Sequence, residues 1–256
     1  MKNLLFFDVD GTLYNTKKEL PISAKEAIFK ARKNGHEVAI ATGRAPFMIR
    51  ELLEELEIDT YITFNGQYVV HKGDVIYTDR IANDELQKII AYGESRNHPF
   101  VFLNEYEMIA SVDNHLAIGE SLHTLQYPYP MIDASYYLQN PVYQTLLFAE
   151  SHEQEQYEKE FPNVQFVRWH KFSCDMLPKE GSKSRGIQKL IEHLQVSMED
   201  VIAFGDGLND VEMLSAVGIG VAMGNGHEEA KAAASIITKH VDEDGLAFAM
   251  KQLNLI

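Results

Sequence analysis

Short apolar runs alternate with helical segments at both ends of the chain, and this order constrains the fold more than any other feature. Near the start, apolar runs at 4–9, 38–41 and 61–63 are separated by two segments with helical patterning. In the last quarter, runs at 201–204 and 219–222 alternate with helical segments in the same way. Repeated strand–helix order predicts a parallel sheet covered by helices on both faces, so we expect an α/β fold.

The middle of the chain has a different pattern. Residues 83–181 mix strand-like runs and helical segments without regular alternation, and tyrosine is concentrated there. This change predicts an inserted α+β domain at 83–181, with 1–82 and 182–256 together forming the surrounding α/β domain.

Composition excludes several classes of protein. The chain of 256 residues has 38 acidic and 23 basic side chains, for a net charge of −15, which argues against a broad nucleic-acid-binding surface. The single cysteine, Cys174, excludes an internal disulfide framework and any multi-cysteine zinc site. No apolar run approaches the roughly 20 residues that span a bilayer, so we expect a cytoplasmic protein without membrane partners. No heptad seam is visible, so a monomer is the expectation, with a weak dimer left open.

Two acidic motifs follow predicted strands. Asp8-Val9-Asp10-Gly11-Thr12 comes directly after the first apolar run, and Gly205-Asp206-Gly207-Leu208-Asn209-Asp210 follows the run at 201–204. Ligands bind outside the carboxyl ends of the strands in open parallel sheets, so these carboxylates are expected to meet there. Asp8, Asp10 and Asp206 would form a three-carboxylate site suited to Mg²⁺, a cation that prefers oxygen ligands. A calcium loop at the first motif and a simple turn at the second are the alternatives.

Two further motifs could hold an anion. Thr42-Gly43-Arg44 ends an apolar strand, and its hydroxyl and backbone N–H groups lead into a helix. Such a segment is often only a cap and a turn. Lys183 stands at the start of a predicted helix, where the helix dipole disfavours it. Lys183 is either an ordinary surface lysine or the positive charge that a carboxylate-rich phosphate site needs.

Together and in this order, the four motifs resemble those of the haloacid dehalogenase superfamily. The pattern is most similar to the Cof-type phosphatases of subclass IIB, in which an insertion of this size is a C2-type cap. Phe64-Asn65-Gly66 after the third strand is also typical of these proteins. The resemblance implies a Rossmann-like core with an inserted α+β cap. It also implies a Mg²⁺-dependent phosphatase that hydrolyses small phosphorylated metabolites through an aspartyl-phosphate intermediate.

The resemblance assigns roles to individual residues. Asp8 would be the nucleophile, and Asp10 would protonate the leaving oxygen and then deprotonate the hydrolytic water. The metal would be held by Asp8, by Asp206 and by the backbone carbonyl of Asp10. The groups expected to bind phosphoryl oxygens are the backbone N–H of Val9 and Thr42, Gly43, Lys183 and Asn209. Thr12 and Asp210 are expected to support the residues that contact the ligands, with Asp210 orienting either Lys183 or the water shell of the metal. Arg44 is expected to contact either substrate or cap.

Other functions remain open at this stage. A phosphomutase also needs an acid/base at Asp10, and a non-catalytic ligand sensor could share the fold. The transport ATPases of the superfamily have threonine at that position, so the aspartate favours rapid hydrolysis. Sugar phosphates, flavin mononucleotide, pyridoxal phosphate and nucleotides are all open as substrates. The tyrosines between Tyr127 and Tyr143 could contact substrate or simply pack.

Overall fold

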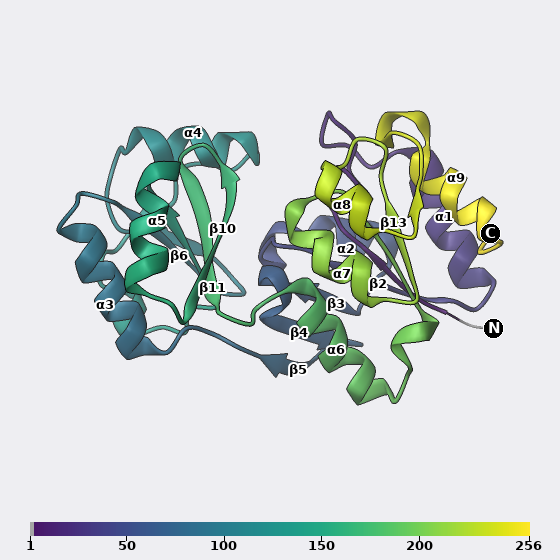
Figure 1. Cartoon of the computed structure of the whole chain (residues 1–256), viewed down its shortest axis with the longest axis horizontal. Helices are drawn as coiled ribbons and strands as arrows, with labels where there is room; N and C mark the ends of the chain where they lie inside the picture. The colour runs from purple at the N-terminus through teal and green to yellow at the C-terminus, as the bar shows by residue number, and fades with distance from the viewer. Residues whose placement is uncertain (1–2) are drawn as a thin grey trace. The chain divides into compact units, whose positions relative to one another are not determined.

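The computed structural model describes residues 3–256, which divide into two compact units (Figure 1). The core unit comprises Met1–Arg44, Met48–Tyr77 and Ser182–Ile256, and the inserted unit comprises Ala45–Phe47 and Thr78–Gly181. The sequence-based boundaries are 82/83 and 181/182, and that domain division stays a prediction.

An eight-stranded sheet in the order β14-β13-β12-β1-β2-β3-β4-β5 forms the centre of the core unit. All pairs from β14 to β3 are parallel, and β4 runs antiparallel to β3. The strands are β1 (Leu4–Phe7), β2 (Glu37–Ala41), β3 (Tyr61–Thr63), β4 (Tyr68–His71), β5 (Asp74–Thr78), β12 (Val201–Gly205), β13 (Ile219–Ala222) and β14 (Ile236–Ile237).

Helices cover both faces of this sheet, which confirms the predicted α/β class (Figure 1). The helices are α1 (Ile22–Lys33), α2 (Arg50–Leu56), α6 (Lys183–Leu194), α7 (Val211–Ala216), α8 (Glu228–Ala233) and α9 (Gly245–Gln252). Short 3₁₀ turns lie at Pro46–Met48, Phe64–Gly66, Met198–Asp200, Leu208–Asp210 and Val241–Glu243.

Alternating residues of β1 explain how the two layers form. Leu5 and Phe7 pack with α1, α2 and α9, whereas Leu4 and Phe6 pack with α6, α7 and α8. Successive strand side chains point to opposite faces of a sheet, so a run of four apolar residues supplies both layers. All four side chains are buried. The strand therefore lies in the middle of the unit, and its carboxyl end is fixed from both sides.

The start of α1 differs from its sequence-based prediction. Ser23-Ala24-Lys25-Glu26 matches a capping box, which predicts Ser23 as the helix cap. In the structure α1 begins at Ile22 with Pro21 as its N-cap and no side-chain cap. The Ser23 hydroxyl instead donates to Asp244 Oδ1, 221 positions further along the chain. The capping box is therefore wrong, because a tertiary partner takes the hydroxyl.

The inserted unit contains a six-stranded sheet in the order β10-β11-β9-β6-β7-β8. All its strand pairs are antiparallel except β7 with β8. A mainly antiparallel sheet combined with helices is an α+β arrangement. The strands are β6 (Phe100–Leu103), β7 (Met108–Ala110), β8 (Met131–Ile132), β9 (Gln144–Phe148), β10 (Val164–His170) and β11 (Ser173–Pro178). The helices are α3 (Asn83–Glu94), α4 (Leu116–Thr124) and α5 (Ser151–Glu160), with a 3₁₀ turn at Tyr136–Leu138.

A hydrogen-bonded tyrosine lies in the apolar core of the inserted unit. Tyr157 of α5 is fully buried among side chains of α3, β6, β10 and β11. Its hydroxyl is 2.8 Å from Nδ1 of His98, and Nε2 of that ring is 2.9 Å from Oε1 of Glu153. The tyrosine therefore packs its ring in the core while its polar atom has a partner.

The two junctions of the insertion are joined within the core unit. Tyr77 is the last residue before the chain leaves this unit, and Arg185 lies just after its return. Nε of Arg185 donates to the Tyr77 hydroxyl at 3.2 Å, so the two ends of the insertion lie close together.

None of the helices in residues 3–256 combines the length and hydropathy that crossing a bilayer requires.

Candidate active site

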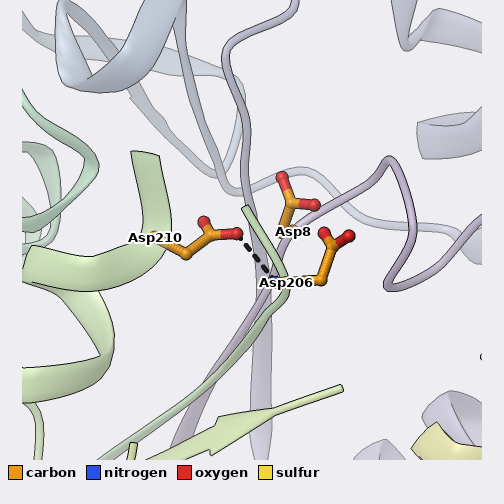
Figure 2. A group of neighbouring side chains, drawn as sticks. All are labelled: Asp8, Asp206 and Asp210. Atoms are coloured by element: carbon orange, nitrogen blue, oxygen red, sulfur yellow. Dashed lines mark hydrogen bonds between the residues drawn. The ribbon is translucent and has the colours of Figure 1, made fainter. Parts of the chain in front are cut away.

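The predicted acidic residues meet at the carboxyl edge of the core sheet. Asp8 directly follows β1, and Asp206 directly follows the neighbouring strand β12. The N–H of Asp8 donates to the carbonyl of Phe204, which ties the two strand ends together. Figure 2 shows the carboxylates of Asp8, Asp206 and Asp210 gathered at this point. One carboxylate oxygen from each residue lies within 4.8 Å of the others.

A buried lysine lies between two of these carboxylates. Nζ of Lys183 is 2.6 Å from Oδ1 of Asp8 and 2.6 Å from Oδ1 of Asp210, and the lysine side chain has no exposed surface. Burial lowers the pKa of Lys183, but the charges of Asp210 and Asp8 outweigh it and raise this pKa above its usual value. The surface-lysine interpretation is therefore wrong.

Both carboxylate oxygens of Asp210 already accept hydrogen bonds. Its Oδ1 binds Lys183, and its Oδ2 accepts hydrogen bonds from the N–H groups of Asp206 at 2.9 Å and Gly207 at 2.8 Å. The dashed line in Figure 2 marks the bond to Asp206. Asp210 thus shapes the loop and orients the lysine.

The site has more negative than positive charge. Three carboxylates face one ammonium group, and burial together with the charges of Asp210 and Asp206 raises the pKa of Asp8 well above its usual value despite Lys183. Burial and the charge of Asp210 raise the pKa of Asp206 to about 6. Thr12 Oγ1 lies 3.4 Å from Asp206 Oδ1, so Thr12 stands behind this carboxylate. A hard divalent cation fits such a set of oxygen donors, because it would offset the uncompensated charge.

Asp10 lies in a different electrostatic environment. Arg44 binds its carboxylate with two hydrogen bonds, Nε to Oδ2 at 2.7 Å and Nη2 to Oδ1 at 2.8 Å. Nζ of Lys18 is 2.5 Å from Oδ1. Burial alone would raise the pKa of Asp10, but the hydrogen bonds and charge of Arg44, together with Lys18, lower it to about 2. Asp10 is therefore held as a carboxylate, and Arg44 has a definite partner within the core unit.

The expected phosphate-binding groups lie on loops that converge at the same sheet edge. Thr42 follows β2 and is buried, and its Oγ1 accepts a hydrogen bond from the N–H of Arg44 at 3.1 Å. Asn209 lies in the turn after Asp206 and donates from Nδ2 to Oδ1 of Asn65 at 2.9 Å. Gly43 also lies against Asn65, because a Cβ on this glycine would be 2.9 Å from Oδ1 of Asn65. Val9 is fully buried in the turn after β1.

Two residues of the site, Asn225 and Lys18, were not singled out by the sequence. Nδ2 of Asn225 donates to the carbonyl of Gly11 at 2.8 Å and lies 3.3 Å from Oδ2 of Asp206, while its Oδ1 accepts from the N–H of Val241. Asn225 thereby ties the two acidic loops together. Asn65 lies in a motif that the sequence did single out, but its contact with Asn209 was not foreseen. An Asn-Gly pair marks both Asn65 and Asn225, but such pairs usually indicate only turns.

Comparison with known proteins identifies the family. The family model of the haloacid dehalogenase-like hydrolases matches residues 5–250. The chain belongs to this family. The match includes every acidic residue described above, so the expected resemblance is confirmed.

Several members of the family are similar over their whole length. A Bacillus subtilis (strain 168) protein named "Putative phosphatase YkrA" is 42% identical over 253 residues, covering 99% of this chain and 98% of the relative. A crystal structure from Geobacillus kaustophilus HTA426 is 45% identical with a TM-score of 0.93, and a subclass IIB sugar phosphatase is 33% identical with a TM-score of 0.89. Each covers 100% of both chains.

These similarities establish a haloacid dehalogenase-type phosphatase. The family generally uses a divalent metal, and the cluster of Asp8, Asp206 and Asp210 offers oxygen donors for one. Phosphatases of this family act on small phosphorylated compounds, which agrees with the expected class of substrate.

Proposed function

We propose that the chain is a Mg²⁺-dependent phosphatase of small phosphorylated metabolites that works through an aspartyl-phosphate on Asp8. The observation that carries this proposal is the buried arrangement of Asp8, Lys183 and Asp210, with Lys183 2.6 Å from each carboxylate. A buried carboxylate whose position is fixed by a cation is suited to in-line attack on phosphorus. We assign the inserted unit the role of a cap domain.

Asp8, Asp206 and the backbone carbonyl of Asp10 are the groups that we assign to the metal. The unbalanced charge at Asp8 and Asp206 supports this choice. We assign Asp210 to Lys183 and the loop instead, because three donors already bind its carboxylate. A bound Mg²⁺ would offset the repulsion between the Asp8 carboxylate and the phosphoryl oxygens.

Asp10 is the proton-transfer group in this proposal. In the first step Asp8 forms a bond to phosphorus while the ester oxygen leaves and takes a proton from Asp10. In the second step water attacks the same phosphorus, gives its proton to Asp10 and releases phosphate from Asp8. The hydrogen bonds of Arg44 favour the ionised Asp10 that the second step requires. Donation in the first step therefore requires Asp10 to exchange these bonds when substrate binds.

The phosphoryl oxygens would be bound by Lys183, Thr42, the backbone of Gly43, Asn209 and the N–H of Val9. Preorganised donors of this kind stabilise charge that develops in the transition state. Sugar phosphates are the first substrates to test, because the subclass IIB relative that aligns with the whole chain is a sugar phosphatase. Flavin mononucleotide, pyridoxal phosphate and a phosphorylated ribitylaminouracil, the substrate in the name of a 26% identical relative, complete the panel.

The test is release of inorganic phosphate from this panel with Mg²⁺ and with EDTA. We expect turnover with Mg²⁺ only, and loss of at least about 10³-fold in Asp8→Asn, because no covalent intermediate can form. Asp200→Asn, an exposed site on the same unit, is the matched control and should retain full activity. Absence of release from every compound by folded wild-type protein would contradict the proposal. Mass spectrometry of acid-quenched enzyme should detect the phosphorylated Asp8 peptide.

A further inference from the structure

Three consecutive residues after β3 have left-handed backbone conformations. The φ angles are 52° at Phe64, 52° at Asn65 and 100° at Gly66. Left-handed backbone is uncommon outside glycine, and for a bulky residue such as Phe64 it is an outlier. Phe64 and Asn65 are also buried. Such a conformation persists only where the surroundings enforce it, and it is concentrated at functional sites.

Backbone hydrogen bonds hold this segment against the Thr42-Gly43-Arg44 loop. The N–H of Phe64 donates to the carbonyl of Arg44 at 3.1 Å, and the N–H of Asn65 donates to the carbonyl of Thr42 at 3.0 Å. The two bonds lie on either side of Gly43. Because a Cβ at Gly43 would be 2.9 Å from Oδ1 of Asn65, the amide of Asn65 lies directly against this glycine.

The side chain of Asn65 also fixes Asn209. Nδ2 of Asn209 donates to Oδ1 of Asn65 at 2.9 Å, so one N–H of this amide is committed and the direction of the other is set. The far side of the Asn209 amide lies against Gly207, where a Cβ would be 2.6 Å from its Oδ1. Asn65 and the turn therefore hold the amide from two sides.

Gly66 brings the segment to a third element of the site. A Cβ at Gly66 would overlap the carbonyl oxygen of Ser182, the N-cap residue of the helix that begins with Lys183. The close approach needs glycine at this position. The left-handed segment thus contacts the loops of Thr42 and Asn209 and the start of α6.

We propose that Asn65 is a positioning residue of the phosphate site, which orients the amide of Asn209 with its side chain and holds the Thr42-Gly43 loop with its backbone. This inference rests on the proposed function, since it assumes that these loops bind a phosphoryl group. Donors act best when a supporting group fixes them before the ligand arrives. Asn65 supplies that support without being assigned a contact to the phosphoryl group.

Asn65→Gly is the variant that separates the side chain from the backbone. Glycine adopts the left-handed conformation readily, so the backbone bonds to Thr42 and Arg44 should persist while the partner of Asn209 is lost. Asn254→Gly is the matched control, because Asn254 is an exposed asparagine of the same unit with φ 56°. Thermal unfolding of each variant checks that it is folded.

Affinity for inorganic phosphate with Mg²⁺, measured by calorimetry and by inhibition of para-nitrophenyl phosphate turnover, is the readout. We expect Asn65→Gly to weaken phosphate binding about 10- to 100-fold, and Asn254→Gly to leave it unchanged. Asn209→Ala should weaken binding in the wild-type background but less than about twofold in the Asn65→Gly background, because Asn65 acts through Asn209. Wild-type affinity in Asn65→Gly, or losses that multiply in the double variant, would overturn the proposal.

Asn65→Asp provides a second variant should Asn65→Gly not fold. Aspartate tolerates the left-handed conformation and keeps an acceptor for Asn209. In the Asn65→Asp background, Asn209→Ala should weaken phosphate binding by the same factor as it does in the wild-type background. A negligible effect of Asn209→Ala on phosphate binding in the Asn65→Asp background would overturn the proposal. If wild-type protein binds phosphate but shows no turnover of any phosphate ester, the proposed function fails while the calorimetric comparison still tests Asn65. Absence of phosphate binding by wild type overturns both.

Discussion

In the core unit Lys183 lies fully buried between Asp8 and Asp210, whereas in the inserted unit Tyr157 lies fully buried beside His98. Both are large polar side chains on helices that pack against a sheet. The lysine is surrounded by more opposite charge than it can balance, but the tyrosine has a neutral hydroxyl and one hydrogen-bond partner. Surplus charge at a fixed position suits catalysis, and a satisfied hydroxyl suits stability.

The largest effect that this comparison predicts is on removal of the buried ammonium group. We expect Lys183→Met to lower the free energy of unfolding by about 3–5 kcal/mol in EDTA, because it leaves Asp8 and Asp210 buried without their cation. Urea unfolding at pH 7 measures this change. Lys189→Met on the same helix is the control, since its partly exposed ion pair with Glu192 should contribute less than about 1 kcal/mol. Equal effects of the two variants would show that the buried network does not stabilise the fold.

The next effect concerns pH and runs in opposite directions at two carboxylates. Folding raises the pKa of Asp206 from 3.8 to about 6, so ionising it opposes folding. The penalty is absent below pH 3.8, grows up to about pH 6 and is constant above. Asp206→Asn should therefore stabilise metal-free protein by about 3 kcal/mol at pH 8 and have little effect near pH 4. Urea unfolding in EDTA at the two pH values measures the difference.

Asp10→Asn is the contrasting variant. The pKa of Asp10 is lowered from 3.8 to about 2, so its contribution to stability is complete above pH 3.8 and is lost as the pH falls through about 2. This variant should therefore be less stable than wild type at pH 8. A stabilising effect of Asp10→Asn, or a destabilising effect of Asp206→Asn in EDTA, would contradict the electrostatic description of the site.

A smaller effect is expected in the inserted unit. Tyr157→Phe should lower the free energy of unfolding by about 1–2 kcal/mol, because it removes the hydroxyl that lies 2.8 Å from His98. It should leave kcat/KM unchanged within about twofold. Tyr106→Phe, at a side chain that is 72% exposed, is the matched control and should change neither quantity. A large loss of activity in a folded Tyr157→Phe protein would mean that this network serves more than stability.

The smallest expected effect concerns Cys174, which we expect not to react with thiol reagents in the native protein. Cys174 is fully buried in the inserted unit, and burial raises the pKa of its thiol to about 12. Native protein at pH 8 should therefore not react with a thiol reagent such as dithionitrobenzoate, because only the exposed thiolate is reactive. Protein unfolded in guanidinium should react and release one equivalent of thionitrobenzoate from the reagent, since the chain has one cysteine. Fast labelling of native protein would show that the inserted unit opens readily.

The sequence predicts those parts of the site that depend on strand ends. Asp8 and Asp206 follow short buried strands, and neighbouring parallel strands place their carboxyl ends together. Local pattern and sheet geometry are sufficient for that inference. The α/β class follows from the same alternation.

Contacts between residues far apart in the chain could not be predicted. The bonds from Arg44 to Asp10 and from Asn225 to Gly11 join residues of different loops, and nothing in the local sequence specifies such a pair. Ser23 is the opposite case, because its local motif predicts a contact that the structure does not contain. Its local motif matches a helix cap, but Asp244 binds its hydroxyl instead. A local sequence motif fails to predict the hydrogen bond of a side chain where a residue distant in the chain binds that side chain instead.

The hydrogen bond between Arg185 and Tyr77 has a consequence for how such a chain can change over time. This bond joins the residue just before the insertion to a residue just after it, so the two ends of the inserted segment are held close together. A polypeptide whose two ends are already held together can lengthen, shorten or be replaced with little disturbance to the sheet that anchors it. Evolution can then exchange the inserted module while the acidic residues at the strand ends keep their positions.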